Sequence, residues 1–401
     1  MIETESIGRR IADYRKLRGW SQRELARRVG YSFSAVEKIE RGLRGVERYS
    51  TINAFARALG VDPSELTGEP RRTRRQQEHA TVPLIRRALT SLPFGVDDGP
   101  IRPLPDLRRE VEAAISAREA GKYARFGEHL PALLEDLQRA TLAAPASSPS
   151  DREQLNALLA EALHSGSSLL RRLGYIDLAW IAVQQARPAA EQSHDALLPI
   201  ANDWHVIELF FRTGDTARAL QLTNQDITFL DNYLATDESP QALSLIGTMH
   251  LLRAMAAAQD VDESDVRDAL DEAARTATRV GSDRDDYQSQ FGPVNTQIFG
   301  VSTAVEMGQG AIALQRTRQV NVDGIPSRER QARYLIDVAR AYSQVGKDAA
   351  ALQVISDAHK RAPEYVINQP MAREVVTALL ERERRTVTPG LRTIAKKMGV
   401  A

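Results

Sequence analysis

The 401-residue sequence has no cysteine, few aromatic residues and no long apolar run. Without cysteine the chain has no disulfide framework and no thiolate metal site, which fits a cytoplasmic protein. No apolar run reaches the roughly 20 residues of a membrane-spanning helix, and the polar, charged N-terminus does not resemble a signal peptide. We therefore expect no membrane partner. Aromatic residues make up 5% of the chain, while alanine and leucine are abundant, as in stacked-helix proteins.

The patterns of catalytic and metal sites are also lacking. The seven histidines are scattered, and none has the four-residue spacing of a helical zinc pair. Residues 308–313 match a dinucleotide-binding fingerprint by letter only, because they follow a predicted helix instead of a strand. The acidic cluster of Asp283, Asp285 and Asp286 lacks the glycine of a calcium loop. We expect no enzyme, no metal and no cofactor.

The overall net charge of zero hides two oppositely charged parts. Residues 1–75 contain 17 basic and 10 acidic residues, a net charge of +7, so the remaining 326 residues carry −7. A basic end suits a polyphosphate such as DNA, whereas the acidic remainder would be repelled by it.

Residues 21–40 carry the pattern of two short helices joined by a tight turn. Ser21 and Glu24 form a capping box, in which the hydroxyl and the carboxylate each take one free backbone amide. Gly30 permits a turn that strains other residues, and Ser32 can cap the second helix. The pattern predicts a helix-turn-helix whose second helix turns four side chains outward: Phe33, Ser34, Glu37 and Lys38.

Residues 5–68 resemble the Cro/C1-type (XRE) helix-turn-helix family, a five-helix domain that binds double-stranded DNA. The resemblance implies a structural pair, Arg15 and Glu40, that orients helices and does not touch bases. It implies DNA contacts at Gln22, Arg23, Arg27, Phe33, Ser34, Glu37, Lys38, Arg44 and Arg48.

The expected roles of these residues differ. Gln22 would clamp a phosphate, and Ser34 would face base edges. Phe33 has two interpretations, an apolar contact to a thymine methyl or packing against its own domain. Lys38 could hold a phosphate or bind a guanine.

A basic linker follows the predicted DNA-binding domain. We divide the chain into a helix-turn-helix domain (1–69), a basic linker with a connecting helix (70–103) and a helical domain (104–401). The run 71–75 contains four arginines and could touch backbone phosphates or form a solvated linker.

Residues 335–363 show the large–small–large spacing of a helical hairpin. Small Ala339 and Ala351 allow two helices to approach, Gly346 opens the turn and Pro363 ends the second helix. Weaker copies place an alanine and a large apolar residue after a turn at intervals of 40, 50, 44 and 38 residues. Residues 371–385 and 391–398 are expected to form a terminal capping pair.

This spacing is similar to the tetratricopeptide (TPR) repeat. The whole chain resembles bacterial XRE-type regulators with a C-terminal TPR-like solenoid, such as TPR-containing regulators of actinobacteria and the peptide-responsive quorum-sensing regulators. We therefore expect an all-α fold: a five-helix domain, then a TPR-like α-solenoid of helical hairpins. The resemblance implies a homodimer whose concave face takes a small-molecule or peptide effector.

Aligning the repeats on their turn glycines predicts which side chains line the concave face. Arginines there could bind a carboxylate or phosphate, and aromatic side chains could supply an apolar wall. The alternative is that the apolar residues form inter-repeat core and that the arginines are solvated or paired with acids. The predicted residues are Trp204, Glu208, Phe211, Arg212, Arg253, Asn295, Ile298, Ser302, Arg333 and Arg340.

Two functions are compatible with these features. The first is a sequence-specific, ligand-responsive transcriptional regulator. The alternative is a protein-interaction scaffold or anti-activator whose solenoid binds a partner protein.

Overall fold

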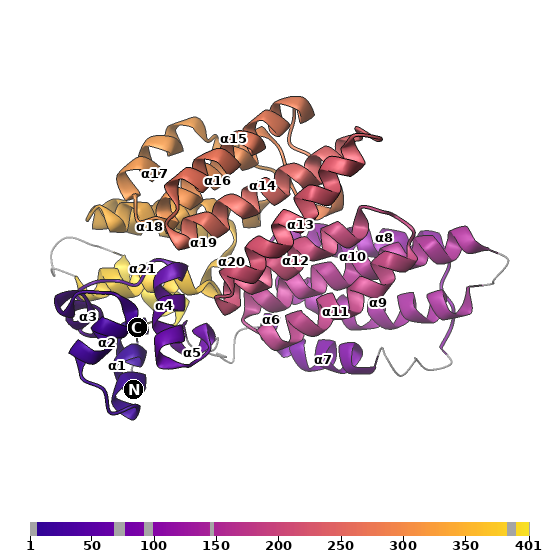
Figure 1. The fold of residues 1–401 in the computed structure, drawn as a ribbon. Helices are drawn as coiled ribbons and strands as arrows, with labels where there is room; N and C mark the ends of the chain where they lie inside the picture. Colours follow the sequence, from indigo (N-terminus) through magenta and orange to yellow (C-terminus); the bar gives the residue numbers. More distant parts are fainter. Residues whose placement is uncertain (1–5, 68–76, 92–98, 145–147, 383–389, 401) are drawn as a thin grey trace.

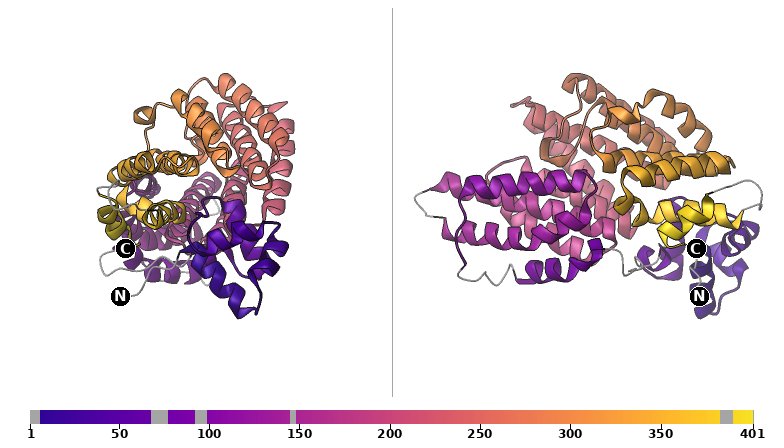
Figure 2. Two further views of the ribbon diagram at one scale, coloured as in Figure 1. Left: turned by 90° about the vertical axis from the view of Figure 1, so that its left-hand side faces the viewer. Right: turned by 180° about the vertical axis from the view of Figure 1, so that it is seen from behind.

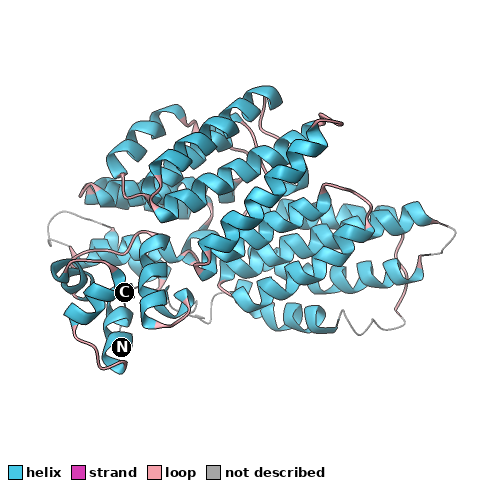
Figure 3. Ribbon diagram, viewed as in Figure 1, coloured by secondary structure: helices cyan, strands magenta, loops and turns pink. Residues whose placement is uncertain are grey.

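The structure is a computed structural model that describes residues 6–67, 77–91, 99–144, 148–382 and 390–400. Helices and loops make up these ranges, and they contain no β-strand (Figure 3). The predicted all-α fold is confirmed. None of the helices in the described ranges is both long and apolar enough to cross a membrane.

The N-terminal domain has the five predicted helices (Figure 1). They are α1 (Ile7–Leu17), α2 (Gln22–Val29), α3 (Phe33–Glu40), α4 (Tyr49–Leu59) and α5 (Pro63–Thr67). Ile11, Leu25, Val36, Ile52 and Phe55 are buried together in the domain core.

The predicted local signals around the turn are present, with one exception. The Ser21 hydroxyl accepts the Glu24 amide at 3.1 Å, and the Ser32 hydroxyl accepts the Ala35 amide at 3.2 Å. Gly30 ends α2 in the left-handed conformation, at φ 73°. The exception is the Glu24 carboxylate, which pairs with the side chains of Arg27 and Arg28 in place of the backbone amide expected in a capping box.

The rest of the chain is a stack of antiparallel helical hairpins. The helices of the stack are α8 (Leu104–Glu119), α9 (Tyr123–Ala143), α10 (Pro149–Leu173), α11 (Ile176–Gln192), α12 (Leu198–Thr213), α13 (Thr216–Leu234), α14 (Pro240–Asp260), α15 (Glu263–Val280), α16 (Pro293–Glu306), α17 (Gly310–Arg316), α18 (Arg328–Gln344) and α19 (Asp348–Arg361). The even-numbered helices pack against one another along the inner side, and each odd-numbered helix packs behind its even partner.

Glycine in the left-handed conformation opens most of the turns, including those at Gly174, Gly214 and Gly346. The middle hairpin, for which the sequence offers no glycine, turns at Val261 with φ 61°. Its turn is therefore made by a β-branched residue in a conformation that such residues rarely adopt.

The segment expected to connect the two domains is part of the stack. Helices α6 (Gln77–Ala80) and α7 (Val82–Ser91) pack against α9. Helix α7 buries Val82, Ile85, Ala88 and Leu89. The basic run 71–75 lies outside the described residues.

The stack curls until its last hairpin touches its first (Figure 2). Glu329 of α18 accepts hydrogen bonds from the Tyr123 hydroxyl at 2.7 Å and from the Arg172 guanidinium at 2.6 Å. Glu364 accepts the Ala124 amide at 3.0 Å. The hairpins therefore form a closed ring, and we use this name below for the described residues between 77 and 361.

Three C-terminal helices lie between the ring and the DNA-binding domain (Figure 1). They are α20 (Pro363–Ile367), α21 (Pro370–Glu381) and α22 (Leu391–Met398). Helix α21 packs against α18, α19 and α22, as expected of a capping helix. It also touches the N-terminal domain, where Gly45 lies against Ala378. A helix that only caps the stack would not make this contact.

Candidate functional site

The second helix of the helix-turn-helix presents the predicted polar face. Ser34 and Lys38 are exposed, while Ala35, Val36 and Ile39 face the core. Phe33 is 43% exposed, and the Arg23 guanidinium lies 5.5 Å from its ring centroid. Phe33 is therefore not packed into its own domain, so a base-edge contact is the interpretation that its position allows.

The structural pair expected from the resemblance is present. The Arg15 guanidinium donates to both Glu40 oxygens, at 2.6 and 2.9 Å, and to the Trp20 carbonyl at 2.6 Å. Hydrogen bonding to Glu40 raises the pKa of Arg15. Gln22 donates its side-chain amide to Glu40 at 2.8 Å. Glu40 thus fixes the start of α2 and the end of α1 relative to α3.

The remaining predicted DNA contacts fall into two groups. Arg27, Glu37 and Arg44 lie on the outside of the domain, where Arg27 pairs with Glu24 and Glu37 pairs with Arg41. Arg48 departs from the prediction, because its guanidinium lies against Gly308 of the ring and its Nε is buried. In this structure Arg48 faces the ring.

Comparisons with known proteins agree with this geometry. Residues 6–67 match a family model described as a helix-turn-helix domain. The chain is 38% identical over 65 residues to the uncharacterized HTH-type transcriptional regulator YazB of Bacillus subtilis (strain 168). The alignment covers 93% of that protein and 16% of this chain. This chain belongs to the HTH-type transcriptional regulators. The regulator binds DNA through its N-terminal domain. No solved structure matches the chain.

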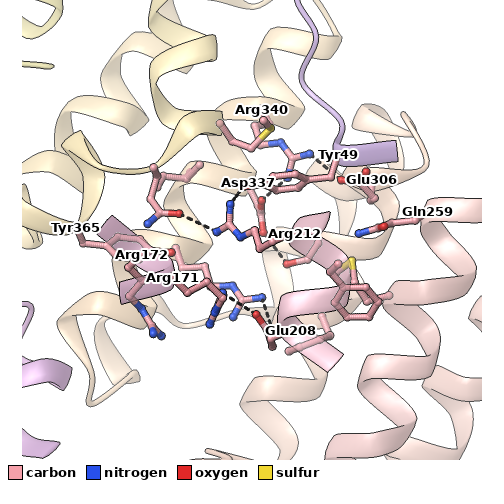
Figure 4. A pocket seen from close by; sticks show the side chains of 18 residues that line it. Tyr49, Arg171, Arg172, Glu208, Arg212, Gln259, Glu306, Asp337, Arg340 and Tyr365 are labelled. Carbon is pink, nitrogen blue, oxygen red and sulfur yellow. Dashed lines mark hydrogen bonds and ion pairs between the residues drawn. The ribbon is translucent and has the colours of Figure 1, made fainter. Parts of the chain in front are cut away.

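The inner side of the ring holds a cavity of about 100 Å³ (Figure 4). Six of the predicted concave-face residues line it: Glu208, Phe211, Arg212, Ser302, Arg333 and Arg340. The repeat register identified them because the cavity lies near the C-terminal ends of the inner helices, next to the turns used for the alignment.

The other four predicted residues do not line the cavity. Ile298 is part of the core between α16 and α18, and Asn295 is also buried. Trp204 packs on His205, with ring centroids 4.4 Å apart. Arg253 pairs with Asp265. The alternative interpretation, core packing or pairing with acids, matches the surroundings of Ile298, Trp204 and Arg253.

Most cations of the cavity are paired with acids. Arg171 lies 2.8 Å from Glu208, and Arg340 lies 2.9 Å from Glu306 and 2.8 Å from Asp337. Burial raises the pKa of Glu208, but the charges of the surrounding arginines, Arg171 first, outweigh it and lower the value to about 2. Glu208 is therefore ionised at neutral pH.

Arg212 and Arg333 are the cations best placed for a ligand. Arg212 donates to two neutral groups, the Tyr49 hydroxyl at 2.5 Å and the Gln369 amide oxygen at 3.4 Å. The side chain of Arg333 is 41% exposed and lies 3.9 Å from Glu208. An anion could approach both without first breaking a close ion pair.

The sequence did not indicate the cavity residues that come from other elements. Tyr49 belongs to the DNA-binding domain, and Tyr365, Gln369 and Met371 come from the C-terminal helices. No repeat register extends to these segments. The hydroxyl of Tyr49 points at Arg212 from across the domain boundary (Figure 4).

Proposed function

We propose that the regulator is a sequence-specific dimeric DNA-binding protein whose TPR-like ring takes a small-molecule or peptide signal that alters operator binding. The observation that carries the proposal is the composition of the cavity. Ring residues and Tyr49 of the DNA-binding domain line the same space. A ligand there would contact both parts, and it could therefore bind one arrangement of the two parts better than another.

The lining favours an anion with an apolar portion. Arg212 and Arg333 offer guanidinium groups suited to a carboxylate or phosphate. Phe211, Phe299 and Met255 supply an apolar wall beside them. The proposal includes no catalytic step.

The alternative, a scaffold that binds a partner protein on its concave face, needs an open inner surface. Here the first and last hairpins touch, through Tyr123 and Glu329, and the DNA-binding domain lies against the inner helices. The ligand-responsive regulator therefore agrees better with the arrangement of the chain.

The proposal is tested by capture of genomic DNA fragments with the full-length protein at two salt concentrations. We expect enrichment of a palindromic site that survives the higher salt, because contacts to bases depend less on salt than contacts to phosphates. Ser34→Ala should relax the preference at one position of that site, with affinity for random DNA unchanged.

Two outcomes would contradict the proposal. Uniform capture that disappears at the higher salt would indicate phosphate attraction alone. Equal loss of binding to the selected site and to random DNA in Ser34→Ala would remove Ser34 from the base-contacting surface.

A further inference from the structure

Residues 45–50, which comprise the end of the α3–α4 connection and the first two residues of α4, form what we call the docked loop. Its backbone is bound by side chains of the ring and of α21. The Ser50 amide donates to Glu306 Oε1 at 2.8 Å, and the Val46 amide donates to Glu374 Oε1 at 2.8 Å. The Arg340 guanidinium donates to the Glu47 carbonyl, with Nε at 2.7 Å. These contacts join residues that are more than 250 positions apart in the chain.

The side chains that hold the docked loop are fixed in place themselves. Glu306 is 2% exposed and Arg340 is 4% exposed. Arg340 bridges the Glu306 and Asp337 carboxylates, and Asp337 also accepts the Ser302 hydroxyl at 2.6 Å. The ring therefore presents a preorganised set of polar groups to the loop, which is unlike an accidental surface contact.

The same segment is where DNA would be bound. Backbone amides and the first turns of helices are common donors to DNA phosphates, and they fix the position of a protein on the duplex. The resemblance to the helix-turn-helix family places DNA contacts at Arg44 and Arg48, in the same connection. In this structure side-chain carboxyl oxygens of Glu306 and Glu374 accept hydrogen bonds from backbone amides of this region, as phosphate oxygens would.

Further acidic groups surround the docked loop. The Glu381 carboxyl group lies so close to Gly42 that a Cβ there would overlap it. Glu47 is buried beside Ser343, whose hydroxyl donates to its carboxylate. A duplex that reached this side of the loop would meet helix α21 and its acidic residues.

We propose that docking of residues 45–50 on the ring and binding of this loop to DNA phosphates exclude each other. The structure is then the form of the regulator that is held off DNA. The inference rests on the proposed function, since it concerns how DNA binding is controlled. It also gives the cavity a role: Tyr49 is part of the docked loop, and an anion that takes Arg212 from Tyr49 removes one of the contacts between the loop and the ring.

A reversible crosslink tests the exclusion directly. A Cβ at Gly45 would lie 3.2 Å from the Cβ of Ala378, a few tenths of an ångström below the range of disulfides, so a small shift accommodates the bond. Because the chain has no cysteine, Gly45→Cys with Ala378→Cys gives a single possible intramolecular disulfide. The probe is a duplex that the wild-type full-length protein has selected from a random pool.

We expect the oxidised double variant to lose at least about tenfold in affinity for this duplex and to regain it on reduction. The single variant Gly45→Cys and the wild type, treated with the same oxidant, should not change. Equal affinity of the oxidised and reduced forms would overturn the exclusion, and so would failure of the two thiols to join. Selection of no duplex by the wild type would instead overturn the proposed function.

A second variant weakens the dock without a crosslink. Glu306→Gln removes the negative charge that binds both the Arg340 guanidinium and the Ser50 amide. A hydrogen bond to a charged group changes an equilibrium constant by roughly tenfold. We expect about tenfold tighter binding of the duplex, because more of the protein is then free to bind. Asp203→Asn is the matched control, since Asp203 is a buried acid paired with Arg187 at 2.6 Å, and neither residue lines the cavity or the docked loop. Unchanged affinity in Glu306→Gln would count against the proposal.

Discussion

Arg15 is the residue on which the geometry of the DNA-binding domain depends most. It neutralises Glu40, whose side chain is 4% exposed, and it also bonds the Trp20 carbonyl before α2 begins. Removing one partner of a buried pair leaves the other charge uncompensated, which costs about 3–5 kcal/mol. We expect Arg15→Ala to lower the free energy of unfolding of α1–α3 by that amount, measured by hydrogen exchange of their amides in increasing urea.

Arg27→Ala is the control for this prediction. The Arg27 side chain is 76% exposed and pairs with Glu24 within the same helix. Such exposed pairs contribute about 0–1 kcal/mol. If the two variants lost equal stability, the Arg15–Glu40 pair would not have the structural role given to it.

Single residues also show how far the sequence could be interpreted. Arg15 and Glu40 were found from the resemblance because both lie inside one small domain with regular spacing. Tyr49 could not be found in this way, since its partner Arg212 is 163 positions away and belongs to another domain. The contact between Arg48 and Gly308 could not be predicted either, because no local sequence pattern connects residues so far apart in the chain. Arg48 was therefore assigned to DNA.

At the scale of helices, α21 does more than the expected capping. Residues 371–385 were expected to cover the end of the stack, and Val375, Val376 and Leu379 are buried. No sequence pattern indicated that Glu374, on the same helix, would accept a hydrogen bond from a backbone amide of the N-terminal domain. Helical periodicity predicts which face of a helix is buried, but it does not predict which other part of the molecule covers that face.

The contact between α21 and the docked loop should depend on pH. Burial, together with the charges of Glu47 and Glu381, raises the pKa of Glu374 to about 8. The hydrogen bond from the Val46 amide and the charge of Arg10 act in the opposite direction. In an undocked form, with the Glu374 carboxyl group in solvent, the pKa of Glu374 would be near 4.3. Docking therefore favours the protonated acid, so the dock is most stable at low pH and weakens as the pH rises through about 8.

We expect the affinity of the full-length protein for its selected duplex to rise between about pH 5 and 8, as the dock weakens. Glu374→Gln keeps an acceptor for the Val46 amide but does not titrate, so its affinity should vary less over the same range. Fluorescence anisotropy titrations of the two proteins measure the difference. The same pH dependence in both would show that Glu374 does not control docking.

At the scale of the whole molecule, the helical hairpins were predictable but their closure into a ring was not. Most hairpins have a local signature of small residues and a turn glycine, and the hairpin that turns at Val261 lacks the glycine. Closure depends on the accumulated rotation from repeat to repeat. The residues that join the ends, such as Tyr123, Glu329 and Glu364, carry no shared pattern in the sequence.

The opposite charges of the two parts bear on how the whole molecule meets DNA. The basic N-terminal segment is drawn to the duplex while the acidic remainder is repelled, so two copies can bind side by side with their rings outward. One helix-turn-helix contacts few base pairs, and a dimer should therefore need two half-sites about 34–36 Å apart or a multiple of that.

We expect two chains per duplex in sedimentation experiments. A duplex with one half-site should bind at least about 100-fold more weakly, because the second contact is gained at high effective concentration. One chain per duplex, with equal affinity for one and two half-sites, would show that the regulator acts as a monomer.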